Sequence, residues 1–109
     1  MNVRLYVWQR ATAALMLPLI LVHLAVIFYA TRQGLTAADI LARTRGSVVW
    51  GLFYSAFVVA AAVHASIGLR NILSEWLTIS RRAVELAALV FGGMLFGLGM
   101  RAVFAVVMP

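Results

Sequence analysis

His64 lies in the middle of an apolar stretch without charged residues, residues 48–69, which is long enough to cross a lipid bilayer. The hydrocarbon core of a bilayer is about 30 Å thick, and about 20 helical residues span it. An ionisable side chain is costly inside this layer, so it usually marks a functional site. Because imidazole is a common axial ligand of haem iron, haem ligation is the first candidate for the chemistry of His64.

Small and polar residues share one face of the helix that is expected to carry His64. At 100° per residue, one stripe contains Ala61, His64, Gly68, Asn71 and Glu75. The small residues leave room beside the imidazole for a flat group such as a porphyrin. Small residues in membrane segments also let a second helix approach, and His64 would then hydrogen-bond that helix. The spacing alone leaves both interpretations open.

The polar end of this helix is a candidate quinone site. Glu75 lies eleven residues after His64, which corresponds to about 16 Å along the helix axis and places it near the membrane surface. Trp76 follows it, and Arg10 and Tyr6 of the first apolar segment are expected opposite. Such groups could donate hydrogen bonds and protons to a quinone headgroup. The alternative is an ordinary interfacial belt of aromatic and charged side chains.

His23, in the first apolar segment, is the second histidine expected inside the membrane. The same rise per residue predicts that His23 and His64 lie at comparable depths. Two imidazoles of one chain could then hold a single iron. Otherwise, His23 is expected to hydrogen-bond a neighbouring backbone carbonyl.

The composition excludes several classes of protein. The chain has 109 residues, of which 65% are hydrophobic, and a net charge of +6. A soluble domain of this size could not bury so much apolar surface. All nine basic residues are arginines that flank apolar segments, as headgroup anchors do, which disfavours nucleic-acid binding. The absence of cysteine excludes a disulfide, an iron–sulfur cluster or a thiolate zinc site built by this chain.

Three apolar segments predict an all-α integral membrane protein with three transmembrane helices in an up-down bundle. The expected helices cover about residues 7–31, 48–76 and 83–108 of a single membrane-anchor domain, residues 1–109. Ser80 is the predicted N-cap of the third helix. The first helix has no cleavage site of small residues, so we expect it to remain in the mature protein.

Two local motifs refine this picture. Thr36 and Asp39 have the spacing of a capping box, which predicts a short amphipathic helix extending through Leu41. Gly93 and Gly97 form a GxxxG pattern, which is typical of close helix packing.

The distribution of arginines favours a cytoplasmic N-terminus by the positive-inside rule. The side that holds the N-terminus has five arginines and the other side has four: Arg4, Arg10, Arg70, Arg81 and Arg82 against Arg32, Arg43, Arg45 and Arg101.

Three runs resemble the membrane-anchor subunits of succinate dehydrogenase: Gln9-Arg10-Ala11-Thr12-Ala13, Gly34-Leu35-Thr36, and the thirteen residues from His64 to Trp76. The resemblance covers about residues 9–82, and the third helix matches in character only. It implies that His64 is an axial ligand of haem b between two anchor subunits. It also implies that Arg10 lies near both the haem and the quinone, with Gly68 and Arg70 in the haem surroundings.

The acidic–aromatic pair that borders the quinone in this family matches Glu75 and Trp76. The usual pair is Asp-Tyr, so an indole stands here in place of a phenol. Relative to the cytochrome b subunit, Gln9 replaces a histidine and Tyr6 replaces a serine. These departures weaken the quinone assignment more than the haem assignment.

The resemblance implies a subunit of a succinate:quinone oxidoreductase in the bacterial inner membrane, serving respiratory electron transfer and the tricarboxylic acid cycle. The partners would be a flavoprotein subunit, an iron–sulfur subunit, a second anchor subunit and lipid, and the chain would not be catalytic alone. Two alternatives stay open. A small proton-coupled multidrug-type transporter needs a carboxylate in mid-membrane, whereas Asp39, Glu75 and Glu85 lie in a loop or near helix ends. A cofactor-free assembly subunit would contain no haem.

Overall fold

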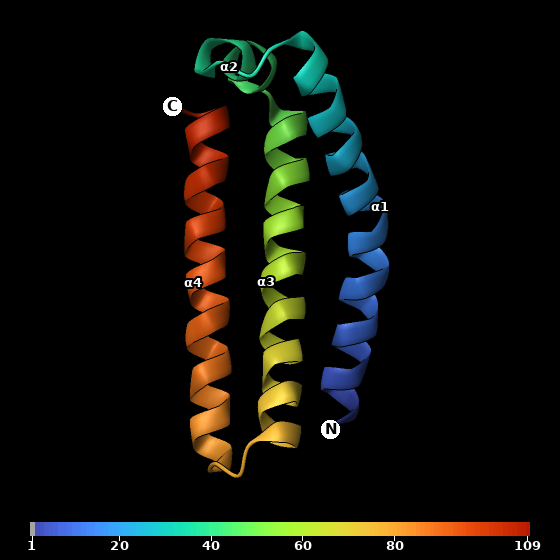
Figure 1. Cartoon of the computed structure of the whole chain (residues 1–109), viewed down its shortest axis with the longest axis vertical. Helices are drawn as coiled ribbons and strands as arrows, with labels where there is room; N and C mark the ends of the chain where they lie inside the picture. Colours follow the sequence, from blue (N-terminus) through green and yellow to red (C-terminus); the bar gives the residue numbers. More distant parts are fainter. Residues whose placement is uncertain (1) are drawn as a thin grey trace.

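The protein forms three long antiparallel helices and one short helix. The computed structural model describes residues 2–109, and its helices are α1 (Val3–Gln33), α2 (Ala37–Thr44), α3 (Val48–Trp76) and α4 (Arg81–Val107) (Figure 1). The three long helices are long and apolar enough to cross a membrane. The all-α bundle with three transmembrane segments predicted from the sequence is therefore confirmed.

Capping side chains set the ends of the long helices. The Asn2 side chain accepts a hydrogen bond from the Arg4 amide at 2.7 Å, so α1 begins at Val3, four residues before the predicted start at residue 7. Ser47 caps α3, which has the predicted bounds. Ser80 caps α4 as predicted, and α4 therefore begins at Arg81. The prediction from hydropathy missed the first turn of α1 because that turn contains the charged Arg4 and precedes the continuous apolar stretch.

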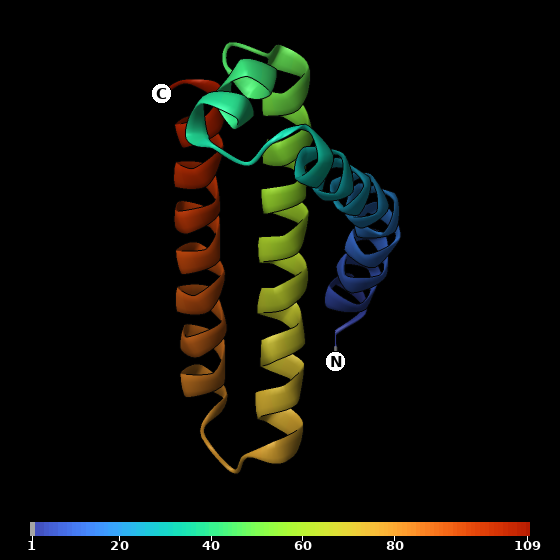
Figure 2. The same ribbon diagram turned by 45° about the horizontal axis from the view of Figure 1, so that its top comes forward.

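The short helix α2 closes the end of the bundle near the C-terminus (Figure 2). The predicted capping box of Thr36 and Asp39 is present, and the helix continues past Leu41 to Thr44. Thr44 is buried and its hydroxyl lies 2.6 Å from the Val106 carbonyl of α4. This tertiary hydrogen bond explains why the helix is longer than its capping pattern predicts.

Helix α3 is central and packs against both α1 and α4 (Figure 1). On α1, only one narrow seam is shielded from solvent or lipid, and its residues are spaced alternately four and three apart, as in a coiled coil. The seam consists of Leu5, Gln9, Thr12, Met16, Leu19, His23, Val26 and Ala30. Every other residue of α1, including Tyr6 and Arg10, is exposed on its outer surface.

Helices α3 and α4 approach closely at two glycines of α4. A Cβ atom added at Gly92 would lie 2.9 Å from Ser66 Cβ, and one added at Gly99 would lie 2.6 Å from Val58 Cγ1. By contrast, a Cβ atom at Gly93 or Gly97 would meet no neighbouring side chain or helix of residues 2–109 within 4 Å. The close packing within the chain therefore depends on Gly92 and Gly99, whereas the face of the GxxxG pattern is open.

Candidate functional site

His64 faces α1 and contacts Thr12. Its Nδ1 atom lies 3.2 Å from the Thr12 hydroxyl oxygen, and this is the one hydrogen bond of the imidazole within residues 2–109. Thr12 belongs to the shielded seam of α1 and is only 6% exposed. The Nε2 atom therefore has no hydrogen-bond partner among the described residues and is available to a ligand.

Gly68 and Gln9 face each other about one helical turn from His64, on the side of the N-terminus. Gly68 is the small residue there, and a Cβ atom added to it would come within 3.5 Å of Gln9 Nε2. Gln9 Oε1 is buried without a hydrogen-bond partner. A buried acceptor without a donor is costly, so this position favours a bound group or water that donates a hydrogen bond.

These observations fit a haem held by one ligand from this chain. The donor is an imidazole nitrogen in an apolar span, and Gly68, one turn away, places no side chain between α3 and Gln9. Gln9 and Thr12 were not assigned to the site from the sequence, although both belong to the alternating seam of α1. That spacing was the signal that could have identified them.

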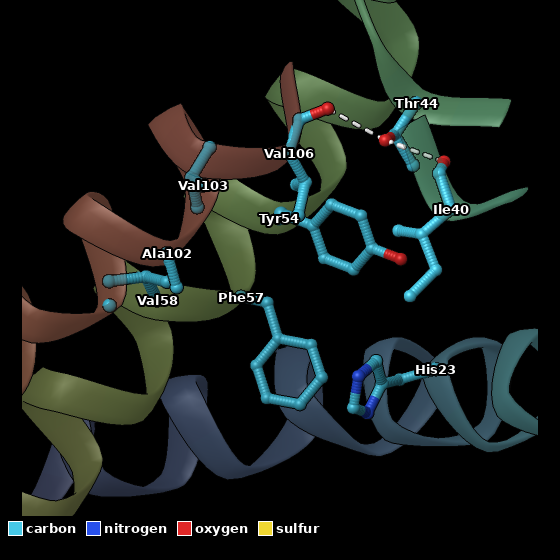
Figure 3. Close-up of a pocket in the computed structure, with 10 residues that line it drawn as sticks. His23, Ile40, Thr44, Tyr54, Phe57, Val58, Ala102, Val103 and Val106 are labelled. Atoms are coloured by element: carbon cyan, nitrogen blue, oxygen red, sulfur yellow. Dashed lines mark hydrogen bonds between the residues drawn. The ribbon is translucent and has the colours of Figure 1, made fainter. Parts of the chain in front are cut away.

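His23 lies in a separate region between α1 and α3. Its ring packs edge-on against Phe57, at 5.2 Å between centroids, and against Tyr54, at 6.2 Å (Figure 3). The three rings border a cavity of about 340 Å³ that Thr44 also lines. The expected hydrogen bond from His23 to a backbone carbonyl is absent from the described residues, because the ring is instead enclosed by aromatic side chains.

The expectation that His23 and His64 lie at comparable depths is wrong. His23 is beside Phe57, which precedes His64 by seven residues, or about 10 Å along α3. Thr12, which contacts His64, precedes His23 by eleven residues, or about 16 Å along α1. A single iron held by both imidazoles would need the two rings at one level, whereas the structure places them at different levels of the bundle.

We therefore expect that His23→Leu leaves the haem content of the complex unchanged. The substitution removes a ring from an aromatic cluster and breaks no hydrogen bond within residues 2–109. The pyridine-haemochrome assay on the purified complex measures this directly. Loss of one haem equivalent from this variant, with His64 intact, would assign His23 to an iron after all.

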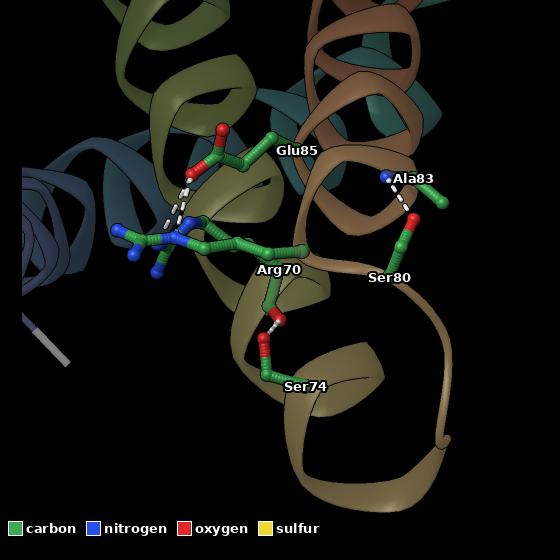
Figure 4. Close-up of polar contacts among 6 residues, drawn as sticks. Arg70, Ser74, Ser80, Ala83 and Glu85 are labelled. Atoms are coloured by element: carbon green, nitrogen blue, oxygen red, sulfur yellow. Dashed lines mark hydrogen bonds and ion pairs between the residues drawn. The ribbon is translucent and has the colours of Figure 1, made fainter.

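Arg70 links α3 to α4 in the structure. Its Nη2 atom lies 3.6 Å from Glu85 Oε1, and Arg81 Nε approaches the same oxygen at 3.4 Å (Figure 4). These three residues and Arg4 lie at the charged end of a groove of about 840 Å³ whose walls are otherwise mostly apolar. The resemblance places Arg70 in the haem surroundings. In the structure, the Arg70 side chain faces α4 and this groove, which His64 does not line.

The four residues expected at the quinone do not share one pocket. Arg10 lies over the Tyr6 ring, with its guanidinium carbon 5.2 Å from the ring centroid, and both are exposed on the outer face of α1. Glu75 instead lines a hollow with Asn2, and Trp76 is 81% exposed. Asn2, the neighbour of Glu75, precedes Arg10 by eight residues, which is about 12 Å along α1. Arg10 and Glu75 therefore lie at different depths, although the sequence predicts that they lie opposite each other.

Comparison with known protein families identifies one match. Residues 1–101 match the family described as the succinate dehydrogenase/fumarate reductase transmembrane subunit. No curated protein and no solved structure gives a significant match. The matched region includes all of α1, α2 and α3 and most of α4.

Proposed function

The chain belongs to the succinate dehydrogenase/fumarate reductase transmembrane subunit family, and we propose that it ligates haem b and borders the quinone site of such a complex. The complex would contain a flavoprotein subunit, an iron–sulfur subunit and a second anchor subunit. We place it in a bacterial inner membrane with the N-terminus on the cytoplasmic side. This chain would perform no dicarboxylate chemistry itself.

The observation that carries the haem proposal is the environment of His64. Its imidazole lies in a membrane-spanning helix, is held through Nδ1 by Thr12, and keeps Nε2 without a partner in residues 2–109. Bound haem would supply a one-electron carrier. The residues of this chain would hold its iron through Nε2, exclude water from one face and place no side chain at Gly68.

The second axial ligand would come from outside this chain. The sequence contains two histidines, and His23 is about 10 Å from the level of His64. We therefore place the haem at the boundary between this chain and a second anchor subunit. A different chain and a second copy are both compatible with this arrangement.

We place the quinone headgroup beside Arg10 and Tyr6 rather than beside Glu75. Arg10 has no ion pair within residues 2–109, and its guanidinium is available to donate hydrogen bonds to a quinone carbonyl. Both side chains lie on the outer face of α1, where a partner subunit would complete the pocket. Glu75 and Trp76 are exposed about 12 Å further towards the membrane surface.

Arg10→Leu is expected to slow succinate-dependent quinone reduction roughly tenfold or more, because a charged hydrogen bond contributes about 1.5–3 kcal/mol. Succinate oxidation with an artificial acceptor should persist. Glu75→Leu is the matched comparison, and we expect it to retain the normal rate. A normal rate in Arg10→Leu together with a slow rate in Glu75→Leu would instead place the quinone at the hollow near Asn2.

The transporter alternative lacks the carboxylate that it needs. Glu85 is paired with Arg70 and Arg81, and the Asp39 carboxylate belongs to the capping box of α2. Glu75 is exposed near the end of α3. The remaining alternative, a cofactor-free assembly subunit, predicts that the purified complex has no b-type haem, which a reduced-minus-oxidised spectrum tests.

A further inference from the structure

We propose that Thr12 is a positioning residue that fixes the tautomer of His64, so that the Nε2 lone pair is directed at the iron. The consequence for the iron rests on the haem ligation proposed above. The tautomer itself depends only on atoms of this chain.

The hydroxyl of Thr12 has a single proton, and that proton is already engaged. Its oxygen lies 2.7 Å from the Trp8 carbonyl oxygen and 3.2 Å from the Gln9 carbonyl oxygen. Carbonyls only accept hydrogen bonds, and the 2.7 Å separation from the Trp8 carbonyl oxygen is the usual length of an O–H···O bond, so we assign the hydroxyl proton to that bond. The hydroxyl oxygen can then only accept a hydrogen bond from His64.

The consequence for the imidazole follows directly. The Nδ1 atom, 3.2 Å from the Thr12 oxygen, must carry the proton that it donates. A neutral imidazole has one ring proton, so Nε2 is left with a free lone pair. Metal-bound histidines commonly donate their other N–H to a protein acceptor, which fixes the tautomer and the ring orientation.

Thr12 is well suited to this role by its backbone and its burial. It is 6% exposed within the seam of α1 that faces α3. In a helix, the hydroxyl of a threonine bonds a carbonyl three or four residues earlier in one of its two allowed rotamers. The same rotamer that engages Trp8 therefore points the oxygen at His64.

The chain of hydrogen bonds should also influence the redox potential of the haem. A donor–acceptor series from His64 through Thr12 to the Trp8 carbonyl polarises the imidazole and makes Nε2 a stronger electron donor. A stronger donor stabilises ferric iron relative to ferrous iron. Removing the Thr12 hydroxyl should therefore raise the midpoint potential of the haem.

The variants Thr12→Val and Thr12→Ser separate the hydroxyl from the packing. Valine keeps the shape and the branched Cβ but loses the hydroxyl, whereas serine keeps the hydroxyl. Thr31→Val is the matched control, because Thr31 also donates to a carbonyl of α1, that of Phe28 at 2.7 Å, and is exposed.

In the purified complex, we expect Thr12→Val to weaken haem retention about 10- to 100-fold and to shift the midpoint potential upwards. Thr12→Ser and Thr31→Val should match the unmodified complex in both measurements.

Nitrogen NMR of the haem-free full-length chain in lipid nanodiscs tests the tautomer independently of haem. With histidine labelled with nitrogen-15 and His23→Leu used for assignment, the His64 spectrum should show a protonated Nδ1 and an unprotonated Nε2. In Thr12→Val the two tautomers should both be populated.

A protonated Nε2 in the unmodified chain would overturn the proposal. An unchanged haem content together with an unchanged midpoint potential of the haem in Thr12→Val would also overturn it. If the complex contains no haem, the proposed function fails, while the NMR result still decides the role of Thr12.

Discussion

His64→Ala is expected to abolish b-type haem in the purified complex. The variant removes the imidazole whose Nε2 atom is the proposed axial ligand, and His23 is too distant to replace it. Loss of a hydrogen bond behind a ligand commonly costs 10- to 100-fold in metal affinity, so loss of the ligand itself should cost at least about 100-fold. The reduced-minus-oxidised spectrum and the pyridine-haemochrome assay measure the loss.

His23→Ala is the matched control for this experiment, because it makes the same substitution at the only other histidine. Succinate oxidation with an artificial acceptor shows whether the peripheral subunits are still assembled. A full haem content and an unchanged α-band in His64→Ala would eliminate His64 as the ligand. The haem would then have to be held by partner subunits alone.

The second large effect is expected from Gly99→Val, which should disrupt the packing of α3 against α4. A Cβ atom at this position would lie 2.6 Å and 2.9 Å from the two methyl carbons of Val58, so Val58 must leave its rotamer or the two helices must separate. Overpacking typically costs about 1–3 kcal/mol, and small residues at helix contacts are the basis of close packing in membranes. We expect a decrease of at least about 2 kcal/mol in the free energy of unfolding.

Denaturant-induced unfolding of the full-length chain in detergent micelles measures this decrease. Gly97→Val is the matched control, because it lies on the same helix and its added Cβ atom would meet no neighbouring side chain or helix of the described residues within 4 Å. Equal stability of the two variants would contradict the packing described for α3 and α4. A greater loss in Gly97→Val would assign the close contact to the GxxxG face instead.

The sequence determined the membrane-spanning elements of this protein. Hydropathy and length located three spans because a bilayer imposes the same requirement on every helix that crosses it. Ser80 and the Thr36–Asp39 capping box located helix starts because capping is a local hydrogen-bond pattern. The runs around Arg10 and His64 also led to the family that the comparison then showed.

Only the tertiary structure decided which residues of different helices meet. The sequence placed Arg10 opposite Glu75 and His23 level with His64, whereas the structure sets Thr12 beside His64 and Asn2 beside Glu75. Periodicity can indicate the buried face of a helix, as the seam containing Gln9 and Thr12 does. It does not determine how far one helix is shifted along another. That register depends on side-chain packing between segments distant in the chain, and an error of eight residues displaces a site by about 12 Å.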